Sequence, residues 1–203
     1  MVNQNYYPLF DHEIQPVLVV EKLFSDEELD KLIDQLSKVD SQAAIVGFEE
    51  ATSDEHFEEL RIKTHEIRKS NVAFLDDPEF KWVYDKLIVA VNHVNNTNYH
   101  KLLYGIEPLQ YTEYDSKYNG FYGPHVDDIN SSNGLKRSLS FTMQLSDGYV
   151  GGELLVYHNG ITITGNKTKG TITFFESSLV HEVKPVTSGF RKSLVGWVLG
   201  PRV

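Results

Sequence analysis

The chain contains no cysteine among its 203 residues. Disulfide bridges and thiolate metal ligands are therefore impossible, and any metal ion must be held by nitrogen and oxygen atoms. The absence also means that cysteine usage gives no indication of the redox compartment in which the protein works.

Basic residues are scarce. The chain has 19 Lys and Arg against 29 Asp and Glu, which gives a formal net charge of −10. Proteins that bind nucleic acid usually gather Lys and Arg against the phosphates. We therefore expect no nucleic-acid partner.

Long apolar runs are also missing. No segment approaches the roughly 20 apolar residues that a membrane-spanning helix needs. The first residues, MVNQNYY, lack the positive charge and following apolar stretch of a secretory signal. We expect a cytoplasmic protein without membrane segments, and a chain of this length suits a single domain over residues 1–203.

Residues 1–108 predict a helix-rich supporting part. A short apolar strand at 16–20 is followed by a capping box, in which Ser25 is the N-cap and Glu28 answers it. Apolar residues then recur at helical spacing to about Val39, which predicts one helix. Asp76-Asp77-Pro78-Glu79 predicts the start of a second helix, because carboxylates and proline favour the first turn.

The segment between these helices is less regular. Residues 51–59 are acidic and only weakly periodic, which favours a mobile loop, either a solvated insert or a lid over a substrate. Residues 67–75 then predict a strand, on which Arg68 is interpreted as a surface charge.

From Leu109 onward the periodicity changes to two. In residues 138–145 every second side chain is apolar and the alternate ones carry a hydroxyl or an amide, so one face of this strand is dry and the other polar. Asn159-Gly160 predicts a tight hairpin. Further strands are predicted at 153–157, 161–164, 170–175 and 193–199. Short strands at this spacing favour a jelly roll or related double-sheet barrel.

Three potential metal ligands stand out in this half. His125 and Asp127 flank Val126, so on a strand both side chains project from the same face. An H-x-D triplet alone is weak support, but His181 follows an aromatic strand and a polar turn, from which it can return to the mouth of the barrel. Two imidazoles and one carboxylate are what a non-haem Fe(II) site with open coordination positions requires.

Arg191 adds a cosubstrate signal. It begins a strand on which Ser193, Val195 and Trp197 share its face. A guanidinium fixed on an inward face needs an anion, and its planar fork matches a carboxylate at two points.

Together these residues resemble the Fe(II)- and 2-oxoglutarate-dependent dioxygenases, in particular the prolyl 4-hydroxylases and the bacterial and viral PKHD-type hydroxylases. The resemblance covers residues 109–203 and is carried by Tyr114, Tyr122, residues 125–127, 137–147, 151–154, 174–183, 185–191 and Trp197. It implies a double-stranded β-helix, jelly-roll or cupin-like, as the catalytic core. It also implies that His125, Asp127 and His181 hold iron, while Arg191 binds the distal carboxylate of 2-oxoglutarate.

Four further residues are candidates for the cosubstrate site. Tyr114 matches a position where relatives often place a tyrosine near the cosubstrate, although the stretch from Tyr114 to the H-x-D triplet is about a residue longer than in animal oxygen-sensing relatives. Gln144 stands where relatives often have a tyrosine that contacts the distal carboxylate, and its amide can donate the same hydrogen bond. Thr142 shares the polar face of Gln144. Trp197 shares the face of Arg191, although packing inside the barrel is its simpler interpretation.

The resemblance implies hydroxylation of an unactivated C–H bond with Fe(II), 2-oxoglutarate and O₂, and with ascorbate as an optional reductant. The favoured substrate is a prolyl residue of a peptide or protein. A free amino acid or other small molecule is the alternative, and a non-enzymatic binding barrel is disfavoured by the intact ligand set. Residues 51–59 and 128–134 are the candidates for a segment that closes over the substrate. The sequence leaves the oligomeric state open.

Overall fold

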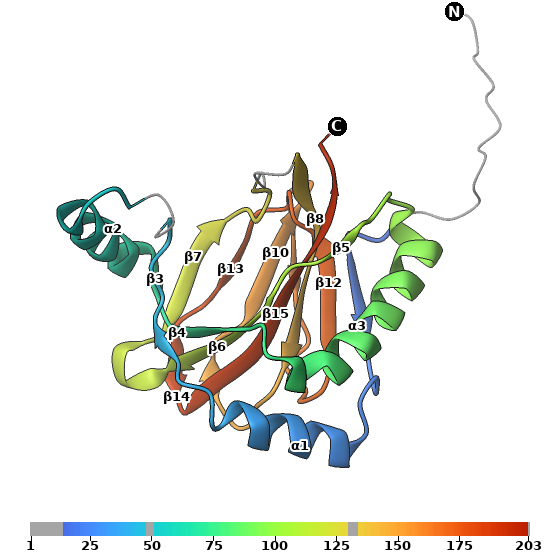
Figure 1. Ribbon diagram of the computed structural model, residues 1–203, viewed down its shortest axis with the longest axis horizontal. Helices are drawn as coiled ribbons and strands as arrows, with labels where there is room; N and C mark the ends of the chain where they lie inside the picture. Colours follow the sequence, from blue (N-terminus) through green and yellow to red (C-terminus); the bar gives the residue numbers. More distant parts are fainter. Residues whose placement is uncertain (1–13, 48–50, 130–133, 203) are drawn as a thin grey trace, which may run out of the picture.

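Two β-sheets that face each other dominate the computed structural model, which describes residues 14–47, 51–129 and 134–202 (Figure 1). The larger sheet has eight strands, in the order β1 (Val17–Val20), β12 (Ile172–Glu176), β8 (Leu135–Gln144), β15 (Phe190–Pro201), β6 (Leu109–Asp115), β4 (Asn71–Leu75) and β2 (Gln42–Ala43), with β5 (Gly105–Ile106) beside β15. The smaller sheet has the order β11 (Ile161–Thr164), β10 (Leu154–His158), β13 (His181–Val183), β7 (Phe121–His125) and β3 (Arg68–Lys69). A separate pair joins β14 (Val186–Ser188) to β9 (Val150–Gly151). The predicted mainly-β double-sheet architecture is confirmed.

Two helices cover the outer face of the larger sheet. They are α1 (Asp26–Leu36) and α3 (Lys81–Val94), which follows the short turn η2 (Pro78–Phe80) and runs into η3 (Asn95–Tyr99). Their apolar stripes pack in one core with Leu139, Phe141 and Met143 of β8 and with Leu145, which directly follows this strand. The predicted parity of this strand is therefore confirmed, and its polar face points between the sheets.

The capping box of α1 forms as predicted. The Ser25 hydroxyl accepts a hydrogen bond from the Glu28 amide, and the Glu28 carboxylate accepts one from the Ser25 amide at 2.9 Å. These bonds satisfy two amides that the first helical turn leaves without partners. The helix ends at Leu36, three residues before the predicted end.

The space between the sheets holds a second, smaller core. Its buried apolar members are Tyr114, Tyr149, Leu154, Val156, Phe175, Val183 and Val186. The two-residue hairpin Asn159-Gly160 joins β10 to β11 as predicted, with φ angles of 49° and 79° that suit asparagine and glycine.

The predicted loop at 51–59 is wrong over most of its length. Residues 54–59 form the first turns of α2 (Asp54–Ile67), whose N-cap Ser53 accepts a hydrogen bond from the His56 amide. Among its residues only Thr64 is buried, so the helix has almost no apolar stripe for a periodicity search to find. The N-cap and the first-turn carboxylates Asp54 and Glu55 are what favour the helix here.

The first half of the chain also supplies strands to the larger sheet. β1 pairs with β12, and β4 pairs with β6, both antiparallel. Residues 68–75 are extended as predicted, but they divide between β3 in one sheet and β4 in the other. In the part of the chain that the structure describes, no helix has the length and apolarity needed to cross a membrane.

Candidate active site

The three predicted ligands meet between the two sheets. His125 ends β7 and His181 begins β13, and the two residues are direct cross-strand partners. Asp127 lies two residues beyond the end of β7, where its amide donates to the Ser177 carbonyl at 2.9 Å. One ligand atom from each side chain lies within 4.8 Å of the others, and no other such His and carboxylate group occurs among the described residues.

Hydrogen bonds fix the orientation of both imidazoles. Nδ1 of His125 lies 2.8 Å from the Gly123 carbonyl, and Nδ1 of His181 lies 3.0 Å from the Leu179 carbonyl. A carbonyl can only accept, so each Nδ1 carries the proton and each Nε2 presents a lone pair. These two lone pairs face Asp127, whose oxygens lie 3.6 Å and 3.3 Å from the Nε2 atoms of His125 and His181.

Electrostatics keep His125 and Asp127 in the forms that bind a cation. Burial, followed by the charge of His181, lowers the pKa of His125 to about 4, so its imidazole is neutral at pH 7. Burial alone would raise the pKa of Asp127, but its interactions with His181, His125 and the Trp197 N–H outweigh burial and hold the pKa below its usual range. Converging lone pairs on two imidazoles and a carboxylate repel one another unless a cation lies among them.

The surroundings of the triad are ordered. The Ser140 hydroxyl on β8 donates to Asp127 at 2.8 Å and contacts the Ser177 hydroxyl at 2.9 Å. The ring of Tyr122 stacks on His125 with a centroid distance of 3.5 Å. These contacts limit the rotation of the carboxylate and of one imidazole, as supporting groups do around metal ligands.

Arg191 lies deeper in the same space and has no acidic partner. Its side chain is 1% exposed, and among the described residues its only hydrogen bond goes from Nη1 to the Ser193 hydroxyl at 3.1 Å. Nε and Nη2 have no acceptor. The guanidinium lies over the ring of Tyr114, 5.2 Å from its centroid. A buried cation in this condition is costly unless an anion pairs with it.

The other predicted cosubstrate residues lie around Arg191. Thr142 is buried and its hydroxyl has no partner, a condition shared by Thr173 on the adjacent strand β12. Gln144 is the cross-strand partner of Ser193 and accepts a hydrogen bond from Tyr149. The Trp197 N–H lies close enough to Asp127 to lower the pKa of that carboxylate. It makes no hydrogen bond of normal geometry, so it too is an unpartnered donor. Unpartnered donors thus converge on one closed space.

The triad and Arg191 line a cavity of about 280 Å³. An adjoining groove of about 410 Å³ runs along β2, β4 and α2, and shares Ile45, Arg68, Phe74 and Gln110 with the cavity. The groove walls include Ala43, Val72 and Phe57.

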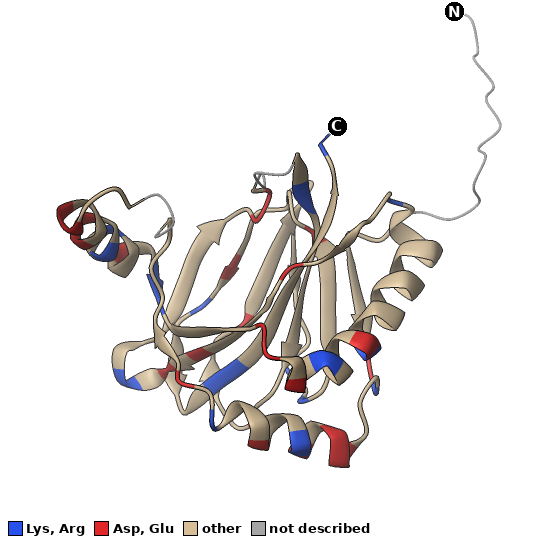
Figure 2. Cartoon of the chain, in the orientation of Figure 1, with Lys and Arg blue, Asp and Glu red and all other residues tan. Residues whose placement is uncertain are grey.

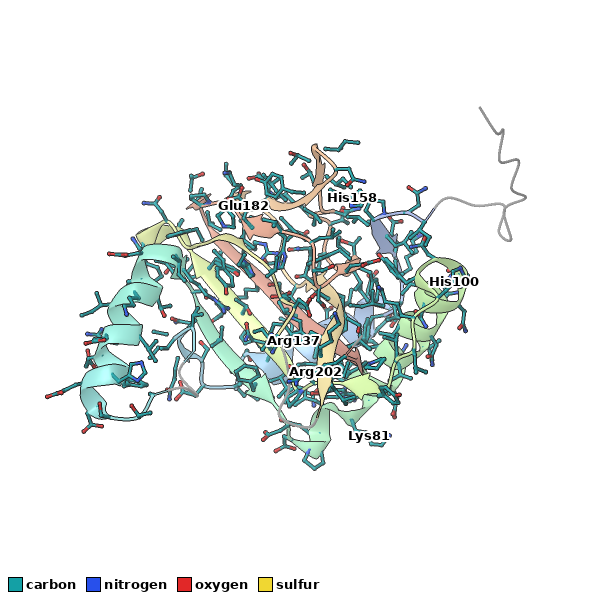
Figure 3. The ribbon with its side chains drawn as sticks, turned by 90° about the horizontal axis from the view of Figure 1, so that it is seen from above. Lys81, His100, Arg137, His158, Glu182 and Arg202 are labelled. Carbon is teal, nitrogen blue, oxygen red and sulfur yellow. The ribbon has the colours of Figure 1, made fainter. Side chains whose placement is uncertain are left out.

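Sequence analysis missed three residues at this site. Arg68, interpreted as a surface charge, is half-buried where the cavity meets the groove, and its guanidinium lies 4.5 Å from the ring centroid of Tyr122. Arg137 stacks on Trp197 at 3.7 Å and pairs with Glu107, and Figure 3 places it near the middle of the molecule when seen from above. Tyr149 is buried close to Arg191. Local periodicity could not reveal these positions, because each depends on a contact between distant segments.

The remaining histidines lie outside the ligand cluster. His100 and His158 are at the periphery in Figure 3, and His56, His65 and His93 belong to the helices. His12 lies outside the described residues. Glu182 follows His181 and faces the other side of β13, where its carboxylate accepts a hydrogen bond from Tyr157.

A family model described as the 2OG-Fe(II) oxygenase superfamily matches residues 109–199. This matched region is similar to that superfamily and spans 91 of the 203 residues. It begins with β6 and ends within β15, so it contains the three clustered ligands and Arg191.

Curated proteins similar to this chain are PKHD-type hydroxylases. One from Idiomarina loihiensis is 36% identical over 80 residues, a match that covers 38% of this chain and 36% of the relative. One from a Synechococcus strain is 44% identical over 80 residues, again 36% of the relative. A longer match, to Crocosphaera subtropica, is 24% identical and covers 90% of this chain and 78% of the relative. The first of these matches therefore spans little more than a third of the relative's length.

Solved prolyl hydroxylase structures share the fold of this chain. A prolyl hydroxylase from Trichoplax adhaerens, in complex with a hypoxia-inducible factor peptide, has a TM-score of 0.67 at 14% identity and covers 90% of this chain and 83% of its own. A viral collagen prolyl hydroxylase from Paramecium bursaria Chlorella virus-1, in complex with 2OG, has a TM-score of 0.64 at 19% identity, with 92% and 97% covered. The fold is accordingly a double-stranded β-helix.

Proposed function

We propose that this protein is a hydroxylase that uses Fe(II) and 2-oxoglutarate to oxidise a C–H bond of a peptide, with a prolyl residue as the target. One observation carries the proposal. A cavity is lined by two imidazoles and a carboxylate that converge on one point, and by a buried arginine without an anion. The first group suits a divalent metal and the second suits a dicarboxylate that also reaches that metal.

In this proposal His125, Asp127 and His181 hold the iron. When bound, Fe(II) with 2-oxoglutarate and O₂ supplies the oxidation of C–H to C–OH, and 2-oxoglutarate leaves as succinate and CO₂. The carbonyls of Gly123 and Leu179 keep the two Nε2 atoms free of protons, and Ser140 holds the carboxylate. The protein thus contributes a preorganised ligand set.

Arg191 would bind the far carboxylate of 2-oxoglutarate through Nε and Nη2. Those two nitrogens form one edge of the guanidinium, which is the edge that a carboxylate contacts at two points. The unpartnered hydroxyl of Thr142 is a further donor or acceptor at this end. Leu154, Phe175, Val183 and Val195 give the cavity apolar walls that limit access of water to the reacting centre.

The groove beside the cavity supports a peptide substrate. A free amino acid would occupy only the cavity mouth, whereas an extended chain could follow the groove between β4 and α2 past Arg68. Two structural relatives are described as prolyl hydroxylases, one of collagen and one bound to a peptide, which favours a prolyl target. Arg68 has only neutral hydrogen-bond partners among the described residues, Ser70 and Gln110, so it can take an anionic group of the substrate.

The test has two parts. Metal analysis should find one Fe(II) per chain in the wild type and in His158→Ala, and almost none in His125→Ala or His181→Ala. Mass spectrometry should then detect addition of one oxygen atom to proline-containing peptides, with succinate released in step, under Fe(II), 2-oxoglutarate and ascorbate. Oxidation of free proline alone would replace the peptide with a small-molecule substrate. Iron bound without any succinate would favour a non-enzymatic barrel.

A further inference from the structure

Beside Arg191, a hydrogen-bonded pair of buried side chains has no part in the ligand set. Gln144, on the inner face of β8, is 2% exposed, and Tyr149, five residues later in the turn after this strand, is 7% exposed. The Tyr149 hydroxyl donates to the Gln144 amide oxygen at 3.0 Å. Because Gln144 is the cross-strand partner of Ser193, and Ser193 accepts from Arg191, the phenol, the amide and the guanidinium occupy one corner.

The backbone around Tyr149 is shaped to bring its ring into this corner. Gly152 has a φ of 64°, and a Cβ there would lie 3.0 Å from the Arg191 side chain and 3.2 Å from the Tyr149 ring. Gly151 has a φ of 76° and passes so close to the Pro185 carbonyl that any Cβ would collide with it. On another side, the Lys167 ammonium lies 4.5 Å from the ring centroid of Tyr149 and is tied to the Gly151 carbonyl.

The hydrogen bond between Tyr149 and Gln144 leaves the Gln144 NH₂ group available as a donor. The phenol of Tyr149 has one proton, and the Gln144 oxygen accepts it. Burial raises the pKa of this phenol, although the nearby Arg191 opposes the rise, so the hydroxyl stays protonated at neutral pH. With its oxygen engaged, Gln144 can turn only its NH₂ group elsewhere, and that group has no protein acceptor among the described residues.

We infer that Tyr149 is a positioning residue for 2-oxoglutarate: its hydroxyl orients the Gln144 carboxamide so that the amide NH₂ donates to the same carboxylate that Arg191 binds. The inference rests on the proposed function, because it needs 2-oxoglutarate at Arg191. Without the phenol, an amide can rotate and present its oxygen, which repels a carboxylate. The Tyr149–Gln144 pair therefore supplies, from two residues, the donor that a single tyrosine would supply at position 144.

A double-mutant cycle measures this coupling. The variants are Tyr149→Phe, which keeps the ring against Lys167 and Gly152, Gln144→Ala, and the double variant. Calorimetric titration of 2-oxoglutarate into Mn(II)-loaded protein reports binding without turnover. We expect Tyr149→Phe to weaken binding about threefold to tenfold, and Gln144→Ala about tenfold. In the Gln144→Ala background, Tyr149→Phe should have no further effect.

Two controls separate positioning from general stability. Tyr99→Phe removes a buried hydroxyl that donates to the Phe174 carbonyl on the helical side of the sheet, so it should lower thermal stability without changing 2-oxoglutarate affinity. Arg191→Ala should weaken binding in every background. If Tyr149→Phe leaves affinity unchanged, or weakens it equally with and without Gln144, the inference is wrong while the proposed function stands. If Arg191→Ala leaves affinity unchanged, the proposed function fails and the inference fails with it.

Discussion

Arg191 concentrates the chemistry of the site in one side chain, because its charge is buried and unpaired. Truncating one member of a buried charge pair typically costs about 2–5 kcal/mol, which weakens binding by roughly thirtyfold or more. We expect that loss for 2-oxoglutarate in Arg191→Ala, with iron binding retained. Arg191→Lys should recover only part of it, since an ammonium lacks the planar two-point geometry.

The same residue gives a stability readout without any ligand. In the ligand-free protein the guanidinium bears the cost of burial with no anion to offset it. Arg191→Met should therefore leave the free energy of unfolding unchanged or raise it by about 1 kcal/mol, as measured by urea denaturation. A large loss of stability would mean that a protein anion pairs with Arg191, contrary to the proposed role.

His125 predicts how the metal-free protein responds to acid. Its folded pKa, about 4, lies below the unfolded value near 6.5, so the unfolded chain binds the proton more tightly. The stability present above pH 6.5 should fall as pH drops from about 6.5 towards 4, by on the order of 3 kcal/mol for this group alone. Urea midpoints with a chelator present should show that slope in the wild type and in His158→Ala. His125→Gln should lose part of it.

Strand alternation predicted that His125 and Asp127 project from one face, and both line the cavity, although Asp127 lies beyond the end of β7. The full ligand set, with His181, was implied by the family resemblance and stays a prediction. Arg191 and Trp197 share a parity on β15 and line the same cavity. The surroundings of Arg68 could not be read in this way. The ring that its guanidinium contacts, Tyr122, lies 54 positions later in the sequence. Its hydrogen-bond partner Gln110 lies 42 positions later.

At the scale of elements, α1 and α2 show what local signals can and cannot do. α1 has both a capping box and an apolar stripe, so it was predictable. α2 has a good N-cap but buries only Thr64, so it lacks an apolar stripe. The acidic residues at 54–59 were therefore interpreted as a loop. Of the second proposed closing segment, 128–134, residues 130–133 lie outside the described residues.

The function of α2 can be tested through that single buried residue. The Thr64 hydroxyl accepts a hydrogen bond from the Val46 amide at 2.9 Å, and residues 45–47 line the cavity. Thr64→Val keeps the shape but removes the acceptor, so we expect a loss of about 1 kcal/mol and faster hydrogen exchange at Val46. Affinity for 2-oxoglutarate should not change. Thr162→Val, in the exposed strand β11, is the matched control. Unchanged slow exchange at Val46 in Thr64→Val would show that α2 does not fix residues 45–47 at the cavity.

The whole molecule places its charges in two distinct environments. Its net charge is −10, and Figure 2 shows residues of both signs on α1 and α2. The cavity is different, since Arg68, Arg137 and Arg191 all line it. Arg137 pairs with Glu107, so Arg68 and Arg191 are the lining arginines without an acidic partner among the described residues. Two such cations suit small anions, and the expected absence of a nucleic-acid partner stays a prediction. The net charge counted from the sequence is dominated by the surface, so composition alone did not indicate the arginines that line the cavity.

Ligand binding should therefore register in the stability of the whole fold, because the site joins both sheets. A ligand at 100 times its Kd adds about 2.7 kcal/mol, which corresponds to roughly 5–10 °C in Tm for a domain of this size. We expect Mn(II) to raise Tm, 2-oxoglutarate to raise it further once metal is present, and a chelator to reverse both effects. Arg191→Ala should keep the rise in Tm caused by Mn(II) and lose most of the further rise caused by 2-oxoglutarate. His181→Ala should lose both rises. An equal 2-oxoglutarate increment in Arg191→Ala and the wild type would place the carboxylate elsewhere, because stabilisation by linkage depends only on the affinity of the folded state.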